Sequence, residues 1–505
     1  MRQFILSTVF LTSTCLTATA VQIDGYCYLE NQTNHEGSKV LFQADSPSAV
    51  TDSVYTDSDG YYLIDLNEGF YDVFYSRLLY YSSELLNVNC FSPATLPEVT
   101  LEHIPQYTPI SGSLSGTLIP GEYLVEDDIY IEEGSSLIIE PGAKLYFWTL
   151  TNFEIRGYLS AAGTESDSIF FHEFITGAGW DGIRFEAESA DSSVMEYCAI
   201  QFASGDGLTV FECSPTISHC RLNNNIWNGV TLRNSASTID SCEISNNSSE
   251  GIQVFGNSNA SITNCLISGN SSHGLMTRDG PAVTVEGCEI STNSMSGVYS
   301  ENSTSEIIDN TIIDNGESGI YYEGGEILIA DNLIRENSDS GIRLRAGESQ
   351  TIDSNVIDSN TADHGGGINC MNCDPVITNN EISANYTNSE ESKGGGIYLD
   401  NCDDGTVLTG NEITGNYISL LDNGTFYLYG GGAYCTNCTI IISENTFSGN
   451  YITGDGNQAS CYLYGGGLSI ENSNVEVTSN TFQQNSLYGG NTAWYYHNYG
   501  GGVYI

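Results

Sequence analysis

Basic residues are scarce in this 505-residue chain, which has 13 Lys+Arg against 64 Asp+Glu and a formal net charge of −51. A surface this acidic repels phosphate groups, which argues against nucleic acid or an anionic membrane as a partner. The charge instead favours cations, basic partners or simple solubility in a saline medium. Only Lys39, Lys144 and Lys393 are lysines, so there is almost no candidate for a lysine general base and no Gly-Lys-Ser/Thr phosphate loop.

Prolines and long apolar runs are also scarce, with one exception at the N-terminus. The 10 prolines, 54 glycines and 32 tyrosines are typical of an ordered β protein with many tight turns. Arg2, an apolar stretch at residues 4–16 and an A-x-A sequence ending at Ala20 predict a signal peptide at residues 1–20. No other stretch approaches transmembrane length, so we expect an exported bacterial protein, secreted or at the cell surface, with no transmembrane segment. Fourteen of the 15 cysteines follow the signal peptide, and disulfides are allowed in such a compartment.

The segment at residues 22–103 alternates apolar and polar residues between Asp-Gly and Glu-Gly turns, which predicts antiparallel strands in a small β-sandwich. Within it, the run TDSDGYYLIDLNEGFYDV at residues 56–73 resembles the carboxypeptidase regulatory-like, transthyretin-like sandwich. The resemblance implies a non-catalytic spacer or binding domain of a secreted protein. Residues 104–110, which include two prolines, are expected to form a linker.

Two local features of this first domain have alternative interpretations. Asp57, Asp59 and Gly60 match part of a calcium loop but lack its twelfth-position glutamate, so a plain turn is favoured over a structural Ca²⁺. No other cofactor is predicted. Cys27 and Cys90 lie near the two ends of the domain and could form a disulfide.

The rest of the chain repeats a motif, as in HCRLNNN, SCEISNN, DNTIIDN and NNEISAN. Its second residue recurs every 22 to 25 residues and then every 31 to 35, at Cys220, Cys242, Cys265, Cys288, Asn310, Asn332, Asn355, Asn380, Asn411, Asn445 and Asn480. Each repeat holds three short β stretches that are stable only when stacked on their copies, about 4.8 Å apart. We therefore predict an all-β chain: the N-terminal sandwich, then a long right-handed parallel β-helix at residues 111–505.

This region resembles the pectin-lyase-like parallel β-helix proteins built of PbH1-type repeats. Its late coils, with TFSGN and GGGAYC, are similar to repeats of polymorphic outer-membrane proteins. Such motifs specify the fold far more than the activity. The closing GGGVYI aligns with the start of a coil, so we expect a C-terminally incomplete solenoid, with any anchor or catalytic module beyond Ile505.

Because the repeats stack, residues at the same position of successive repeats lie above one another in a row, which we call a ladder. The closing asparagines of the motif, such as Asn247 and Asn270, are expected to bond to one another at a corner, because buried amides need partners. The cysteine column forms either packed thiols or disulfides between neighbouring coils. The C-x-x-C pairs that begin at Cys370 and Cys435 follow the repeat rather than a zinc cage, and no metal site is predicted.

The strand after the glycine corner of each coil has two outward residues. In the middle coils these predict a ligand-binding face, to which the aromatic late loops add Trp494: Arg278, Tyr299, Tyr321, Arg343, Arg345, Tyr398, Asp400 and Trp494. Arginines pair with uronate carboxylates and tyrosines stack on sugars, which favours a polysaccharide groove. The alternatives are a solvated sheet face with cross-strand charge pairs and, for the late loops, mutual packing. For catalysis, the candidates are Glu301, Glu323, Arg343 and Arg345.

These patterns predict a secreted or cell-surface β-helix protein that acts in carbohydrate binding or adhesion. Its partner would be a polysaccharide or cell-surface glycan, or a protein. An extracellular polysaccharide lyase or glycoside hydrolase of the pectin-lyase-like superfamily is the alternative, because that fold often supports such chemistry. A structural stalk is the third interpretation.

Overall fold

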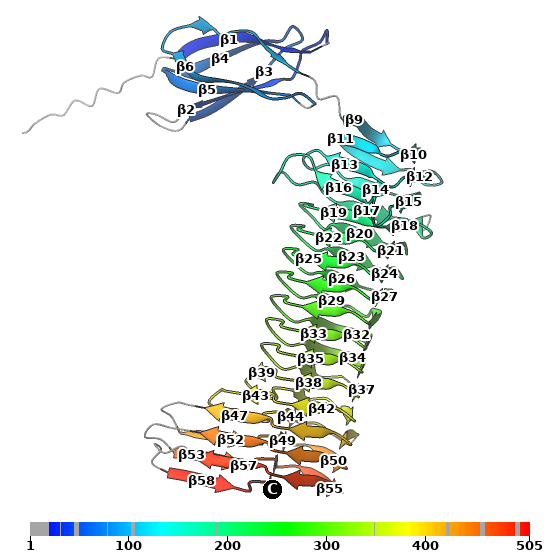
Figure 1. Cartoon of the computed structure of the whole chain (residues 1–505), viewed down its shortest axis with the longest axis vertical. Coiled ribbons are helices and arrows are strands. Elements are labelled where there is room, and N and C mark those ends of the chain that lie inside the picture. The colour runs from blue at the N-terminus through cyan, green and yellow to red at the C-terminus, as the bar shows by residue number, and fades with distance from the viewer. Residues whose placement is uncertain are drawn as a thin grey trace, which may run out of the picture. The chain divides into compact units, whose positions relative to one another are not determined.

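The computed structural model describes residues 20–30, 32–44, 50–77, 79–102, 107–187, 190–347, 349–403, 405–420, 425–454, 460–489 and 495–505. The chain divides into two compact units, residues 1–108 and 109–505 (Figure 1). Every named element in the described ranges is a β-strand, and none of these ranges contains a helix that could cross a membrane. Apart from Ala20, the predicted signal peptide lies outside the described residues.

The first unit is a β-sandwich of two four-stranded sheets, as predicted. One sheet contains β1 (Ala20–Leu29), β4 (Tyr61–Asn67), β7 (Ala94–Thr95) and β8 (Val99–Leu101). The other contains β2 (Lys39–Ala44), β3 (Val50–Tyr55), β5 (Gly69–Ser76) and β6 (Ser83–Cys90). Alternate residues of the strands face a shared core, in which the hydroxyls of Tyr62 and Tyr75 are hydrogen-bonded at 2.8 Å.

The structure settles the geometry of the two open features of this unit. The Asp57 carboxylate accepts hydrogen bonds from the backbone N–H groups of Asp59 (3.0 Å) and Tyr61 (2.9 Å), which is the geometry of a plain turn. Cys27 and Cys90 are both buried free thiols, so the predicted disulfide is not formed in this structure. Cys27 lies on β1 of one sheet and Cys90 on β6 of the other.

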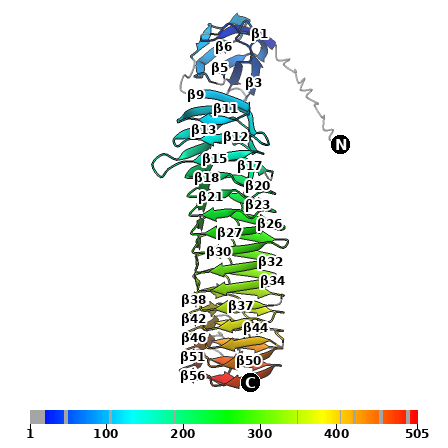
Figure 2. The same cartoon turned by 90° about the vertical axis from the view of Figure 1, so that its right-hand side faces the viewer.

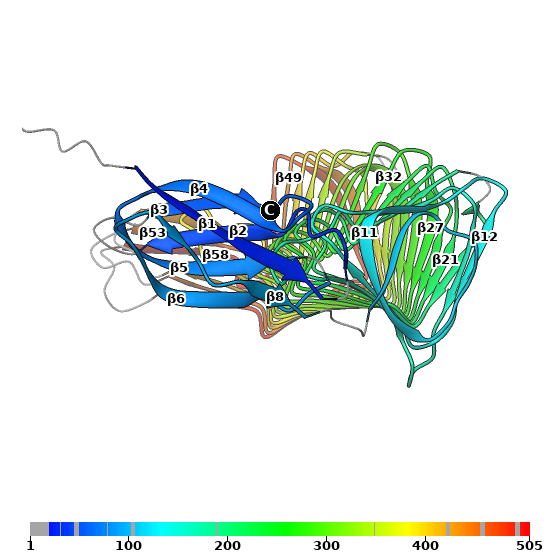
Figure 3. The same cartoon turned by 90° about the horizontal axis from the view of Figure 1, so that it is seen from above.

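The second unit is a parallel β-helix whose coils lie over one another (Figures 2 and 3). It opens with β9 (Tyr107–Ser113) and β11 (Gly121–Ile131), and the later strands form three parallel stacks. Stack 1 contains β14 (Phe153–Ile155), β17 (Ile183–Glu186), β20 (Leu208–Phe211), β23 (Val230–Arg233), β26 (Ile252–Phe255), β29 (Leu275–Arg278), the first halves of β32 (Val298–Ile308) and β34 (Ile320–Ala330), β36 (Ile342–Arg345), β40 (Ile368–Met371), β44 (Ile397–Asp400), β49 (Ala433–Thr436), β54 (Leu468–Glu471) and β59 (Val503–Tyr504).

The other two stacks complete each coil. Stack 2 contains β10 (Gly116–Leu118), β12 (Ser136–Ile139), β15 (Tyr158–Ala162), β18 (Val194–Glu196), β21 (Thr216–Ser218), β24 (Thr238–Asp240), β27 (Asn259–Thr263), β30 (Ala282–Glu286), the second halves of β32 and β34, β37 (Gln350–Asp353), β41 (Val376–Thr378), β45 (Thr406–Thr409), β50 (Thr439–Ser443) and β55 (Asn474–Thr478). Stack 3 contains β13 (Ala143–Phe147), β16 (Ile169–Glu173), β19 (Cys198–Gln201), β22 (Arg221–Asn223), β25 (Glu243–Ser245), β28 (Leu266–Ser268), β31 (Glu289–Ser291), β33 (Thr311–Ile313), β35 (Leu333–Arg335), β38 (Val356–Asp358), β42 (Glu381–Ser383), β46 (Glu412–Thr414), β51 (Thr446–Ser448) and β56 (Thr481–Gln483).

The corners of a coil explain why the chain is rich in asparagine and glycine. The coil that contains β26 and β27 turns at Asn246 (φ 56°), Gly256 (φ 60°) and Asn264 (φ 52°). This left-handed region is costly for most residues, whereas glycine has no Cβ to clash and asparagine tolerates it best among the others. The residues between these corners alternate inward, so that aliphatic side chains form one continuous core.

Two buried ladders run along corners of the solenoid. In the first, the Nδ2 of each closing asparagine donates to the Oδ1 of the next, as from Asn293 to Asn315 at 3.1 Å. In the second, the backbone N–H of Cys265 donates to Cys288 Sγ at 3.4 Å, and that of Cys288 donates to Asn310 Oδ1 at 2.9 Å. All described cysteines are free thiols, and those in this ladder accept hydrogen bonds where later coils use an amide oxygen.

The late coils are wider because strands are inserted between stacks 3 and 1. They form a five-stranded sheet of β39 (Thr361–Ala362), β43 (Tyr386–Thr387), β47 (Tyr417–Leu420), β52 (Tyr451–Gly454) and β57 (Ser486–Gly489) and a three-stranded sheet of β48 (Phe426–Tyr429), β53 (Ser460–Tyr464) and β58 (Tyr495–Tyr499) (Figure 1). A small core that includes Phe426 and Ile452 lies between them. Tyrosines of neighbouring strands stack on each other, as Tyr427 does on Tyr462 at 4.7 Å.

Candidate polysaccharide-binding groove

The outer face of stack 1 concentrates the arginines of the second unit. Of the eight arginines after residue 109, six lie on or directly beside this face between β14 and β36, and Arg221 and Arg335 lie on stack 3. We call this face the arginine strip, and its charged and aromatic residues are Glu154, Arg156, Arg184, Glu186, Phe211, Arg233, Phe255, Arg278, Tyr299, Glu301, Tyr321, Glu323, Arg343 and Arg345.

A groove of about 530 Å³ lies at the end of the strip nearer the C-terminus. The strands supply Tyr299, Tyr321, Arg343 and Arg345, while the turns before them supply His273, Met295, Ser296, Glu317, Ser318, Ser338 and Asp339. The groove therefore brings together four of the residues predicted for the ligand-binding face. Because neighbouring coils are in register, residues 22 positions apart in sequence lie side by side here.

Aromatic rings and one guanidinium form a continuous stack in the groove. The His273 ring lies 4.8 Å from that of Tyr299, and the Tyr299 ring lies 5.2 Å from that of Tyr321. The Arg343 guanidinium carbon then lies 5.6 Å from the centroid of the Tyr321 ring. The ring faces thus cover one another, which corrects the expectation that the tyrosines stack on sugar rings. Their edges and hydroxyls remain for contact with a ligand.

The charged groups of the groove are only partly paired. Arg343 Nη1 lies 2.7 Å from Asp339 Oδ2, and the Tyr321 hydroxyl donates to Glu323 Oε2 at 3.1 Å. Arg345 has neither an ion pair nor a hydrogen-bond partner among the described residues. The buried Nε atoms of both Arg343 and Arg345 lack an acceptor within the described ranges, so each guanidinium has one unsatisfied donor.

His273 is the one residue of the groove suited to proton transfer near neutral pH. Burial lowers the pKa of His273, and its Nδ1 accepts the backbone N–H of Ser296 at 3.2 Å. The neutral ring therefore carries its proton on Nε2. Burial also raises the pKa of the Tyr299 and Tyr321 hydroxyls, which keeps them protonated as donors.

The predicted catalytic carboxylates lie side by side rather than on opposite sides of a cleft. Glu301 on β32 and Glu323 on β34 are register partners on one sheet face. Glu301 Oε2 lies 3.2 Å from Arg278 Nε, and Glu323 accepts the Tyr321 hydroxyl. This row of charges presents two neighbouring carboxylates on one sheet face. It can bind a charged ligand, together with the arginines at either end.

One other predicted residue, Tyr398, does not belong to an open face. Tyr398 is only 4% exposed, and its hydroxyl donates to Asp400 Oδ2 at 3.1 Å. The wide late coils bring the His364 ring to 5.2 Å from the Tyr398 ring, which closes this part of the sheet. The predicted binding face therefore ends at Arg345, and Trp494 lies outside the described residues.

Sequence reasoning missed Arg156, Arg184, His273 and Asp339. Arg156 and Arg184 lie in the irregular first coils, where the repeat cannot be aligned with confidence from sequence. His273 directly precedes a glycine and Asp339 lies two residues before one, so they belong to two adjacent corner columns that the search for outward strand residues ignored. Aligning these corner columns would have identified them.

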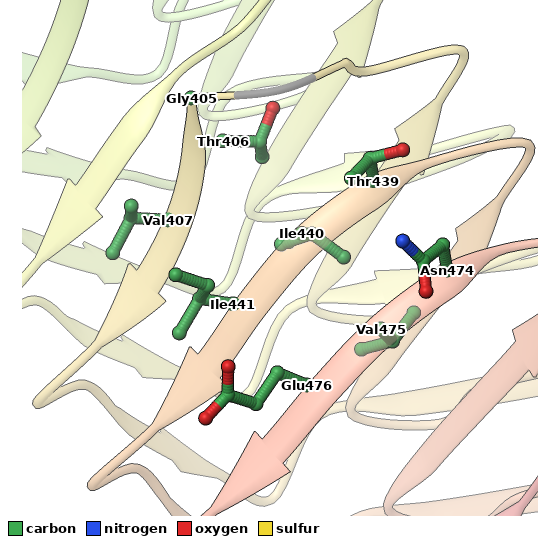
Figure 4. Close-up of a pocket in the computed structure, with 9 residues that line it drawn as sticks. All are labelled: Gly405, Thr406, Val407, Thr439, Ile440, Ile441, Asn474, Val475 and Glu476. Atoms are coloured by element: carbon green, nitrogen blue, oxygen red, sulfur yellow. The ribbon is translucent and has the colours of Figure 1, made fainter.

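Two further hollows lie on the solenoid. One, of about 610 Å³, occupies the strip between β17 and β26. The other, of about 340 Å³, lies on stack 2, where Figure 4 shows Val407, Ile441 and Glu476 on three neighbouring strands. Ile441 is 45% exposed there, and none of the predicted site residues lines this hollow. Within the described ranges, no group of three or more His, Cys, Asp or Glu side chains is arranged to hold a metal ion.

Comparison with known proteins agrees with the fold. The sequence model of a family described as "right handed beta helix region" matches residues 212–352 and 323–440. No curated protein matches the chain.

Several solved structures are similar to the chain. The Dettilon tailspike protein (gp208) is 12% identical, with a TM-score of 0.32, 69% of this chain covered and 62% of that one. The A-module of the Azotobacter vinelandii mannuronan C-5 epimerase AlgE6 is 15% identical, with a TM-score of 0.28 and 72% and 91% of the two chains covered. PfbA, a surface adhesin of Streptococcus pneumoniae, is 11% identical, with a TM-score of 0.24 and coverage of 71% and 82%. At these identities and TM-scores, the structures bear on neither the ligand nor the activity of this chain.

Proposed function

We propose that this protein is exported and binds an acidic polysaccharide in the groove around Arg343 and Arg345. The observation that supports the proposal is Arg345, a cation without an ion-pair partner among the described residues of a chain with a net charge of −51. In a protein so rich in carboxylates, an unpaired guanidinium beside a groove favours an anionic ligand.

The spacing of the two arginines suits carboxylates on a sugar chain. Arg343 and Arg345 are two residues apart on β36 and face the same side, about 6.6 Å apart along the strand. A guanidinium binds a carboxylate through two parallel hydrogen bonds. The edges of Tyr299 and Tyr321 would bind sugar hydroxyls nearby.

The net charge of the protein opposes an acidic ligand at long range but not at contact. At physiological ionic strength the Debye length is about 8 Å, so distant carboxylates are largely screened. Groups within hydrogen-bond distance of the ligand are screened much less. Binding would therefore depend on the local arrangement in the groove.

Calorimetric titration with oligouronates and with neutral oligosaccharides of the same length tests the proposal. Arg345→Gln should weaken oligouronate binding at least tenfold, because a hydrogen bond to a charged group contributes about 1.5–3 kcal/mol. Arg335→Gln is the matched control, since Arg335 lies on stack 3 and pairs with Glu336. Equal affinity for neutral chains, or an equal loss in the control, would contradict the proposal.

A polysaccharide lyase is a second candidate, favoured by the position of His273 in the same groove. A lyase needs a base for the proton next to the uronate carboxylate and a cation that neutralises this carboxylate. Arg343 could be the cation, and His273 could be the base in the tautomer with its proton on Nδ1, which requires Nδ1 to release the Ser296 N–H. Release of unsaturated uronate, lost in both His273→Gln and Arg343→Gln, would support this activity, and binding without release would leave the protein a lectin or adhesin.

The first unit fits the proposal as an accessory domain. Its two-sheet architecture is compatible with a carboxypeptidase regulatory-like sandwich, which would serve as a spacer or a second binding domain. We propose that it separates the groove from a point of attachment at the cell surface. Binding by residues 109–505 alone, with unchanged affinity, would support the role of a spacer.

A further inference from the structure

A second pocket lies on the arginine strip, about 610 Å³ in volume, between β17 and β26. It is lined by Arg184, Phe211, Arg233, Phe255 and Asp279, together with threonine and asparagine side chains. Arg233 is the register partner of Phe211 on one side and of Phe255 on the other. Its guanidinium carbon lies 5.6 Å from the centroid of the Phe211 ring, so a cation–π contact holds the group in place.

Arg233 shares with Arg345 a feature that the other arginines of the strip lack. Four arginines of the strip are paired with a carboxylate of their own coil or a neighbouring one: Arg156 with Glu154, Arg184 with Glu186, Arg278 with Glu301 and Arg343 with Asp339. Among the described residues, Arg233 and Arg345 have no ion-pair partner. Each pocket of the strip thus contains one unpaired cation.

The two unpaired cations are aligned along the axis of the solenoid. Arg233 is the last residue of β23 and Arg345 is the last residue of β36. Register pairing connects them through β26, β29, β32 and β34, which makes five steps from strand to strand. At about 4.8 Å a step, they lie roughly 24 Å apart. Between them in the same row lie Phe255, the Arg278–Glu301 pair and Glu323, whose carboxylate accepts the Tyr321 hydroxyl.

We infer that the groove and the second pocket are two ends of one elongated site, and that its ligand is a polyanionic chain long enough to bind Arg233 and Arg345 at once. The inference rests on the proposed function, because it takes an acidic polysaccharide as the occupant of the groove. It adds a length requirement and a second contact point. A short oligomer reaches one cation, whereas a longer one gains the second contact without a second loss of translational freedom.

Titration of an oligouronate series tests the inference. With the wild-type chain, affinity should increase at least tenfold at the first oligomer that spans about 24 Å, since effective concentrations in linked binding raise affinity by large factors. Arg233→Gln should remove this step while leaving the affinity for short oligomers at Arg345 unchanged. Arg233→Lys keeps the charge but not the planar contact with Phe211, and should retain part of the step.

The outcomes separate this inference from the proposed function. If short oligouronates bind and require Arg345, but affinity does not increase with length or the step survives in Arg233→Gln, the elongated site is wrong and the groove stands. If no oligouronate of any length binds, the proposed function fails and this inference fails with it. Arg233 is exposed, so its variants should keep the thermal unfolding midpoint of the wild type.

Discussion

Truncating one asparagine of the corner ladder should destabilise the solenoid by about 3 kcal/mol. Asn315 is fully buried, and its Oδ1 accepts both the backbone N–H and the Nδ2 of Asn293, each at 3.1 Å. Its Nδ2 donates to Ile290 O at 3.1 Å and to Asn337 Oδ1 at 3.0 Å. In Asn315→Ala the backbone N–H of Asn293 loses its acceptor, and the Ile290 carbonyl loses a donor. Each buried group left unsatisfied costs about 1–3 kcal/mol, so the sum for the two groups is roughly 2–6 kcal/mol.

Urea unfolding combined with amide hydrogen exchange can measure this loss. A solenoid opens locally, so exchange should accelerate most in the coils next to residue 315, while the global midpoint falls less. Asn257→Ala is the control, because Asn257 is exposed and its side chain forms no hydrogen bond with the described residues. The control should stay within about 0.5 kcal/mol of the wild type. If Asn315→Ala also stayed within that range, the ladder would not be a source of stability.

Three further perturbations have expected outcomes. Cys288→Asn should leave the free energy of unfolding nearly unchanged, because an amide oxygen can replace Sγ as acceptor for the Cys265 N–H. Cys288→Ala removes the acceptor and should cost about 1–3 kcal/mol in urea unfolding. Equal losses in the two variants would refute this view of the ladder. Burial lowers the pKa of His273 in the folded protein, so the unfolded chain binds a proton at this residue more readily. The contribution of His273 to stability is therefore complete above about pH 6.5 and is lost as the pH falls below it. His273→Gln should therefore flatten the fall in stability below that pH, and an unchanged profile would exclude His273 as its origin. Oligouronate affinity should increase between about 10 and 100 mM NaCl, where the Debye length falls from about 30 to 10 Å, and a steady decrease would contradict a repulsive net charge.

The coil architecture could be predicted from sequence because a parallel β-helix converts sequence period directly into spatial stacking. Residues one period apart, such as Tyr299 and Tyr321, must be neighbours once the fold is assigned. What the period does not determine is which charges pair across a corner, since Asp339 reaches Arg343 from a turn. Tyr398 is likewise buried beside His364, which lies in a widened corner whose path does not follow the 22-residue repeat.

Cysteine illustrates the same limit at the level of chemistry. The column could be aligned from sequence, and both packed thiols and disulfides fitted its spacing. In the structure the thiols are free and accept backbone N–H groups, a role that follows only from the orientation of the corner. Asparagine can therefore take over at residue 310 without a change in the fold.

The row that contains Arg345 also has an explanation that needs no ligand. Along it, Arg278, Glu301, Glu323 and Arg345 are successive register partners, so two neighbouring carboxylates lie between two cations. The carboxylates of Glu301 and Glu323 repel each other, because like charges on adjacent strands are destabilising. The role of Arg345 could therefore be to offset this repulsion through its attraction to Glu323. A double-mutant cycle separates the two roles.

If charge balance is the role of Arg345, then Arg345→Gln lowers the stability of the protein. Adding Glu323→Gln then restores the stability, and it restores oligouronate binding if that was lost. If ligand binding is its role, stability changes by less than about 1 kcal/mol, because Arg345 forms no ion pair with any residue of the described ranges. Oligouronate binding should then stay lost in the double variant, even though removing the Glu323 charge by itself favours an anionic ligand. Recovery of binding in the double variant would refute direct contact between Arg345 and the polysaccharide.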